Sequence, residues 1–144
     1  MSALENAKKL LEGDVTIVLV KDDDVITSQL KGIRPLMNLL RGGKDLTGYV
    51  VADKIIGKAQ AMLIIKARVK EAFGKVVSVS GKEIMEKNGV KVTYETLTDK
   101  IINRNGTDIC LMEKAVQSID DIEEGYRALI ETVKKLCDGN KESG

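Results

Sequence analysis

The segment from Asn103 to Glu113 concentrates side chains that can bind a ligand or react with one. It joins a glycine-containing turn to an expected helix, and its polar and reactive members are Asn103, Arg104, Gly106, Thr107, Asp108, Cys110 and Glu113. An arginine can grip a carboxylate or a phosphate with two hydrogen bonds, and a thiol at a helix start ionises more readily. Structural alternatives remain, because these polar groups can stabilise the turn, Thr107 or Asp108 can cap the helix, and a free cysteine is most often simply buried.

The chain contains no histidine, which limits the chemistry available to that segment. Histidine is the commonest metal ligand and general base in proteins, and without it no Cys–His dyad can form. The candidate catalytic groups are therefore Asp53, Cys110 and Glu113. Glu113 can serve as an acid or base if it is buried near Asp53; otherwise it is an ordinary charge on a helix surface.

A second candidate segment begins at Asp53, after the apolar strand expected at 49–52 and before a helix expected at 54–67. Strand-to-helix junctions are where α/β sheets bind ligands, although aspartate is equally suited to capping the helix. Lys54 and Lys58 are four residues apart and share one face of the expected helix, where they could hold a phosphate or lie on a solvated edge. Gly57 allows a close approach, by a ligand or by a packed neighbour.

The composition excludes several classes of function. The 144 residues predict one domain over 1–137 and a flexible tail over 138–144. Twenty-three basic against 22 acidic residues give a net charge of +1, so no overall field attracts nucleic acid or a membrane surface. Charges interrupt the apolar stretch 49–69, which excludes a membrane span. Two cysteines in a domain of this size indicate a reduced, cytoplasmic protein.

The hydrophobic pattern places alternating helices and strands around these segments. Ser2 and Glu5 form a capping box for a first helix, and Ser80 and Glu83 form a second one. The expected order is a helix, a hairpin (15–30), a helix (35–40), a strand (49–52), a helix (54–67), a strand (76–79), a helix ending at 88–89, a strand (90–95) and helices (109–117 and 121–136). This order predicts an α/β fold, a three-layer αβα sandwich whose mixed sheet begins with the N-terminal hairpin.

Two segments, 52–61 and 102–116, with weaker support from Gly32 to Leu36, resemble a known family. The chain is similar over nearly its whole length to the small prokaryotic family described as domain of unknown function 1893. One departure is Leu111, where relatives tend to carry proline. The resemblance implies a cytidine-deaminase-like fold without an established activity.

The resemblance also implies where a deaminase's zinc motifs would fall. A zinc deaminase needs a His or Cys followed by Ala and Glu, and a Pro-Cys-x-x-Cys motif on another helix. The first falls at Val51–Asp53; the second falls near Ser80–Glu83 by element order or at Cys110–Glu113 by similarity. Neither alignment supplies three zinc ligands. We therefore expect a degenerate site with no zinc and no other cofactor.

Three hypotheses for function follow from these residues. The preferred one is a pocket that holds a nucleotide-like or phosphorylated anionic molecule, such as a nucleotide sugar. Its expected ligand-binding residues are Asp53, Lys54, Lys58, Asn103, Arg104, Gly106, Thr107, Asp108 and Cys110, with Asp53 and Cys110 bordering the same pocket. The alternatives are a metal-independent enzyme acting on such a ligand, and a structural or regulatory subunit with a vestigial pocket. Neither nucleic acid nor a membrane is an expected partner, and a homo-oligomer remains open.

Overall fold

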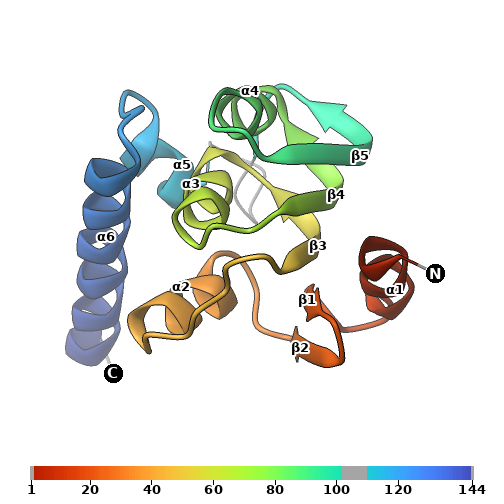
Figure 1. Cartoon of the computed structure of the whole chain (residues 1–144). Helices are drawn as coiled ribbons and strands as arrows, with labels where there is room; N and C mark the ends of the chain where they lie inside the picture. The colour runs from red at the N-terminus through yellow and green to blue at the C-terminus, as the bar shows by residue number, and fades with distance from the viewer. Residues whose placement is uncertain (1, 102–109, 144) are drawn as a thin grey trace.

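A mixed sheet with helices on both faces makes up the computed structural model, which describes residues 2–101 and 110–143 and side chains as far as Leu136 (Figure 1). The strands are β1 (Ile17–Lys21), β2 (Asp24–Ser28), β3 (Val50–Ile56), β4 (Glu71–Ser78) and β5 (Lys91–Thr98). The helices are α1 (Ala3–Leu10), α2 (Arg34–Arg41), α3 (Lys58–Lys66), α4 (Val79–Lys87), α5 (Leu111–Val116) and α6 (Ile122–Ser143).

The strand order is β2-β1-β3-β4-β5. β1 is antiparallel to both β2 and β3, whereas β3, β4 and β5 run parallel to one another. Because α3 and α4 connect the parallel strands, the carboxyl ends of those three strands lie at the same edge of the sheet. The mixed sheet with its N-terminal hairpin, expected from the sequence, is confirmed.

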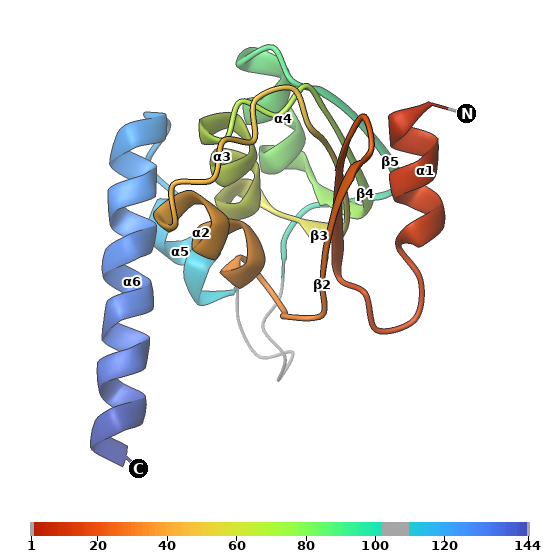
Figure 2. The same ribbon diagram turned by 60° about the horizontal axis from the view of Figure 1, so that its bottom comes forward.

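The helices are divided unequally between the two faces of the sheet. α1 lies alone on one face, over a small cluster that includes Ala7, Leu11, Val18, Val20 and Phe73 (Figures 1 and 2). The other face carries the larger core, to which α2, α3 and α4 contribute, and α5 and α6 pack against α3 from outside. The predicted three-layer sandwich is therefore confirmed. Within the described residues, no helix is long and apolar enough to cross a membrane.

Several element ends differ from those that the sequence predicts. The strand predicted at 49–52 continues to Ile56, and α3 begins only at Lys58, so Asp53 is not a helix cap and Lys54 lies in a strand. The physical reason is the ladder with β4, in which Ile55 and Ile56 pair with Val76 and Val77 and override the local helical pattern. At the other end of the chain, α6 continues beyond the predicted end at Leu136, to Ser143.

Alternation along β3 changes phase near Asp53. Val51 and Ile56 both pack in the larger cluster, although residues an odd number of positions apart in a regular strand point to opposite faces. The carboxylate of Asp53 accepts the backbone N–H of Ile55 at 3.3 Å, a local bond by which aspartate turns the backbone. Asp53 lies two residues after Val51, so ordinary alternation already directs its side chain to the face of the sheet that α3 covers, where it meets Gln60.

Candidate functional site

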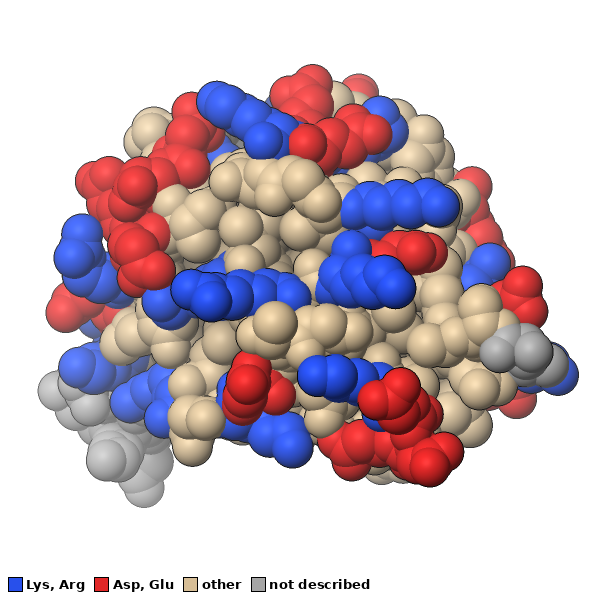
Figure 3. Space-filling model, in the orientation of Figure 1, with Lys and Arg blue, Asp and Glu red and all other residues tan. Residues whose placement is uncertain are grey.

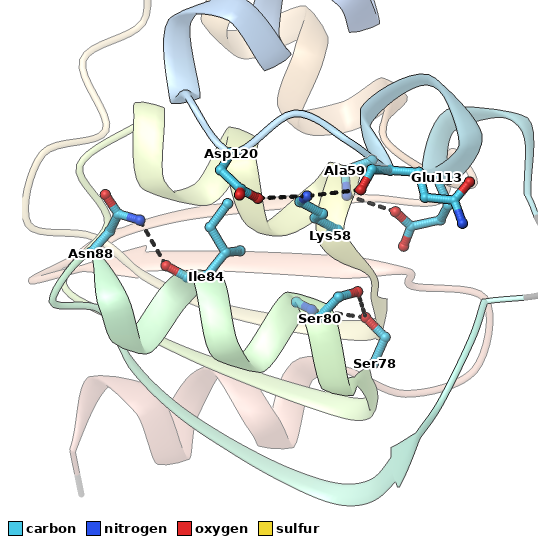
Figure 4. Close-up of polar contacts among 10 residues, drawn as sticks. Lys58, Ala59, Ser78, Ser80, Ile84, Asn88, Glu113 and Asp120 are labelled. Atoms are coloured by element: carbon cyan, nitrogen blue, oxygen red, sulfur yellow. Dashed lines mark hydrogen bonds and ion pairs between the residues drawn. The ribbon is translucent and has the colours of Figure 1, made fainter.

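A hollow of about 240 Å³ lies where β3, β4 and β5 end and α3 and α4 begin. Its lining comprises Lys58, Ser78, Ser80, Asp99, Lys100, Ile101, Glu113 and Gln117. Figure 4 shows four of these, Lys58, Ser78, Ser80 and Glu113, gathered around the starts of the two helices. Open α/β sheets bind their ligands beyond the carboxyl ends of parallel strands, so this hollow is the candidate functional site.

The start of α3 is capped by a side chain from a distant helix. Gly57 is the N-cap and supplies no side-chain bond; instead Glu113 in α5 accepts the N–H of Ala59 at 2.9 Å. A β-carbon on Gly57 would lie 2.6 Å from Cδ of Glu113 and 2.8 Å from Cγ1 of Ile101. Glycine is therefore needed here for space, and Glu113 fills the place that an external anion would take at this helix end.

Two charged side chains flank that cap. Burial raises the pKa of Glu113, against the lowering effect of the backbone N–H groups of Ala59 and Lys58 and of the Lys58 charge. Lys58 is itself 8% exposed, and its Nζ lies 2.9 Å from Oδ1 of Asp120 and 3.3 Å from the carbonyl oxygen of Gln117. The Lys58 ammonium holds the pKa of Asp120 below its usual value. Lys58 therefore fixes the α5–α6 connection beside the hollow.

The start of α4 forms the opposite wall. Ser78 ends β4 and caps α4, its hydroxyl accepting the N–H of Gly81 at 3.0 Å, and the hydroxyl of Ser80 lies 3.3 Å from that of Ser78. The capping box predicted at Ser80–Glu83 is wrong, because the helix begins two residues earlier. A β-carbon on Gly81 would lie 3.0 Å from the carbonyl carbon of Gly57, so the two helix starts meet in close contact.

We expect Ser78→Ala to lower the free energy of unfolding by about 1–2 kcal/mol, the usual range for losing an N-cap. The physical reason is that Ser78 is 1% exposed, so water cannot readily replace its hydroxyl at the Gly81 N–H. Urea titration measures the change. Ser2→Ala is the matched control, since Ser2 caps α1 at an exposed site and its loss should cost less. A Ser78→Ala effect no larger than that of the control would contradict the assigned role.

Asp53 lies beneath the first turn of α3 rather than in the hollow's lining. It is 5% exposed and accepts a hydrogen bond of 2.6 Å from Nε2 of Gln60, which is 3% exposed. Burial raises the pKa of Asp53 to about 7, although the hydrogen bond from Gln60 works in the opposite direction. Oε1 of Gln60 is buried and has no hydrogen-bond partner among the described residues.

The structure brings together only some of the residues predicted to form a site. Glu113 and Lys58 line the hollow. Lys54 lies in β3 and donates a hydrogen bond to the carbonyl oxygen of Gly13, so the predicted helical face shared by Lys54 and Lys58 is wrong. Cys110 is the half-buried N-cap of α5, and its N–H donates to the carbonyl oxygen of Ile101 at 2.9 Å. The predicted cap residues Thr107 and Asp108 lie outside the described residues.

Five predicted ligand-binding residues lie outside the described residues: Asn103, Arg104, Gly106, Thr107 and Asp108. The lining also contains residues that the sequence did not single out, namely Ser78, Asp99, Lys100, Ile101 and Gln117. Ser78 carried a detectable signal, a serine three residues before a glycine at the end of an apolar strand. The others are recognisable only from the sheet topology that brings them to one edge.

The remaining surface offers less chemistry. A larger hollow of about 380 Å³ between α5 and α6 lies away from the carboxyl ends of the parallel strands and is lined by Leu111, Lys114, Ala115, Thr132, Lys135 and Leu136. On the face shown in Figure 3, basic and acidic residues are interspersed, so that face carries no single-sign patch for nucleic acid. In the described part of the chain, no three potential ligands among Cys, Asp and Glu gather to hold a metal ion.

The hollow therefore contains hydrogen-bond donors and acceptors that lie close together. Its side-chain donors are the hydroxyls of Ser78 and Ser80 and the ammonium groups of Lys58 and Lys100, and the start of α4 lies beside them. Its acceptors are the carboxylates of Asp99 and Glu113. Such a mixed lining suits a small molecule that carries both an anionic group and hydroxyl or N–H groups.

One family model and two solved structures are similar to this chain. The family model described as domain of unknown function DUF1893 matches residues 5–133. The crystal structure of a DUF1893 family protein from Thermotoga maritima is similar, with a TM-score of 0.83 and 27% identity over 90% of this chain and 89% of that one. A dCMP deaminase from the cyanophage S-TIM5 in its apo form gives a TM-score of 0.44 and 14% identity over 64% of this chain and 93% of that one. No curated protein matches the chain.

Proposed function

The chain belongs to the DUF1893 family. From the geometry of the hollow at the carboxyl ends of β3, β4 and β5, we propose that this hollow binds a phosphorylated, nucleotide-like small molecule. One observation carries the proposal: the start of α4, two serine hydroxyls and a lysine converge on the same hollow. Free N–H groups and partial positive charge at a helix start are the usual means by which α/β proteins hold a phosphate.

The two helix starts are assigned different roles in this proposal. The start of α3 is already capped by a charged carboxylate, that of Glu113, whereas the start of α4 is capped by the neutral hydroxyl of Ser78. The partial positive charge of the α4 start is therefore not compensated by its cap, and a ligand phosphate is expected there, beside Ser80 and Lys100. The Glu113 carboxylate is then available to accept hydrogen bonds from ligand hydroxyl or N–H groups. Ribose hydroxyls and the exocyclic amines of bases are groups of that kind.

The size of the hollow limits the ligand. Ligand pockets are typically about 300–1,000 Å³, and this one measures about 240 Å³. We expect it to enclose one ring with its attached phosphate, or one sugar phosphate, while any further part of the ligand projects outward. A nucleotide or a nucleotide sugar held by one half fits that description better than an enclosed dinucleotide does.

A metal-independent enzyme is the second candidate, favoured by one feature. The pKa of Glu113 is raised by burial, and its carboxyl group borders a hollow that contains serine hydroxyls. Groups with pKa values displaced toward neutrality are suited to proton transfer. Under this alternative a bound nucleotide would be converted to products in the presence of the protein, and Glu113→Gln would abolish that conversion while retaining binding.

We expect a thermal-shift screen of nucleotides, nucleotide sugars and sugar phosphates to give at least one hit that Ser80→Ala weakens by about 1.5–3 kcal/mol, the range for a lost hydrogen bond to a charged group. Calorimetry on the hit measures the change. Ser28→Ala, a serine substitution in β2, is the control and should leave binding unchanged. Arg104→Ala tests in the same way the contact predicted from the sequence. If no compound in the screen stabilises the protein at millimolar concentration, the proposal is wrong.

A further inference from the structure

β5 is the last strand of the sheet that the described residues form. It pairs with β4, and no strand of the described residues pairs with its other side. Its eight residues include no buried one, and Tyr94 and Leu97 are 38% and 42% exposed. Figure 1 shows β5 at the outer margin of the sheet, opposite the hairpin edge.

This edge has few of the features that protect exposed strands. Natural edge strands are kept short, interrupted by proline or a bulge, lined with charged side chains or covered, because their free N–H and C=O groups otherwise pair with other chains. The other edge, β2, has five residues, begins with Asp24 and follows an acidic turn at Asp22 and Asp23. β5 has eight residues, no proline, and a Val-Thr-Tyr run that favours strand pairing. Its two charged residues, Lys91 and Glu95, are of opposite sign, so they can complement a partner strand as well as repel one.

The sequence of β5 is complementary to itself in one antiparallel register. When Thr93 faces Thr93 of a second copy across a two-fold axis, Lys91 of each copy faces Glu95 of the other. Alternation keeps these pairs on one face of the sheet and places Val92 against Tyr94 on the opposite face. Opposite charges, paired threonines and a β-branched residue against an aromatic one are all favourable cross-strand neighbours. The next antiparallel register, with Tyr94 on the axis, instead sets Lys91 against Leu97 and forms no charge pair.

We propose that the chain forms a homodimer through β5, with the two sheets joined into one across a two-fold axis. The partner is a second copy because the same strand supplies both halves of each charge pair. The two-fold axis also sets the hollows of the two copies toward opposite ends of the joined sheet, so each hollow remains complete within one chain. The dimer is independent of the ligand proposed for the hollow.

A charge exchange between Lys91 and Glu95 tests the proposal on the intact protein. Both residues are exposed, so their substitutions leave the fold unchanged. We expect the native protein to dimerise in sedimentation experiments between about 10 µM and 1 mM, since interfaces of less than standard size are weak. Lys91→Glu alone and Glu95→Lys alone should each raise the dissociation constant at least about tenfold, because like charges then face each other twice.

Two further experiments restore opposite charges across the proposed interface and decide the question. Mixing the two single variants should give a heterodimer, and the double variant should dimerise about as well as the native protein. Circular dichroism confirms that every variant is folded. A native protein that stays monomeric throughout the concentration range would overturn the proposal. A dimer that is insensitive to both single substitutions would also overturn it, by showing that another surface is used.

Discussion

Replacing Asp53 with asparagine should stabilise the protein at pH 8 by a few kcal/mol, while leaving its stability near pH 4 almost unchanged. The reason is the buried carboxyl group, whose pKa is raised to about 7 from an ordinary value of 3.8. In the folded state Asp53 keeps its proton over a pH range in which the unfolded chain has lost it. Each pKa unit of difference corresponds to about 1.4 kcal/mol.

The sign follows from proton binding. Between pH 3.8 and about 7 the folded state binds one more proton at Asp53 than the unfolded state does, so the free energy of unfolding falls as pH rises. The contribution from this group is fully present below pH 3.8 and is lost as pH rises through about 7. The shift sets an upper bound on the order of 4 kcal/mol for that loss. Asparagine does not ionise and keeps the contribution at all these pH values.

Asparagine also matches the local hydrogen bonding. Its oxygen can accept the N–H of Ile55, as Oδ1 of Asp53 does now, and its amide can donate to Oε1 of Gln60 once the terminal amide of Gln60 turns over. Gln60 then still has one unpartnered amide atom among the described residues, as it does now. Urea titrations of both proteins at pH 4, 6 and 8 measure the effect. Asp45→Asn is the control, because the pKa of Asp45 is lowered by the N–H of Thr47 and its loss should not stabilise at pH 8. Destabilisation by Asp53→Asn at pH 8 would show that the carboxylate form is required.

Replacing Gly57 with alanine should lower the free energy of unfolding by about 2–4 kcal/mol, the combined cost of overpacking and of an unsatisfied buried donor. The new methyl group would occupy the space of the Glu113 carboxylate. Glu113 would leave the N–H of Ala59, which it now accepts at 2.9 Å, and α3 would lose its cap. The displaced carboxylate would enter the hollow, so ligand binding should be lost with the stability.

A double-mutant cycle separates this mechanism from a general intolerance of alanine. In a Glu113→Ala background the cost of Gly57→Ala should fall to about half or less, because the main obstacle is gone and neighbouring residues couple strongly. The contact with Ile101 accounts for the remainder. Glu113→Gln is the conservative control, since its side-chain oxygen can still accept from Ala59. Additive costs in the cycle would refute the assigned contact between Gly57 and Glu113.

Local signals in the sequence predicted the elements whose ends are set locally. Ser2 caps α1 as its spacing indicates, and the hairpin turns at the charged segment that separates its two apolar runs. The start of α3 could not be found in this way, because β3 is extended to Ile56 by pairing with a strand about twenty residues later. At this strand-to-helix junction, pairing between strands shifts the helix start beyond Asp53 and Lys54, the residues that mark it in the sequence.

Part of the candidate site was predictable, because some of its residues can be recognised from their type alone. Glu113 and Lys58 were found because their residue types suit chemistry, and both line the hollow. The contact between Gly57 and Glu113 was not predictable, because the two residues are far apart in the sequence. Only the fold brings the Glu113 carboxylate into the space where a side chain at position 57 would lie. Asp53 was misplaced because a strand-end aspartate and a helix cap look alike in sequence, whereas its hydrogen bond to Gln60 depends on the extension of β3 to Ile56 and the later start of α3.

The single helix on one face of the sheet determines how the native protein opens locally. α1 is held by the smaller cluster and by Lys8, whose ammonium lies 4.4 Å from the ring centre of Phe73, while the larger cluster on the other face is complete without it. Native proteins open locally in cooperative units, and an element that packs on its own part of the core can form such a unit. The amide protons of α1 should therefore exchange with solvent through a detachment of that helix, well before those of α3, and the detached state would expose the apolar side of β1 and β3 to neighbouring molecules.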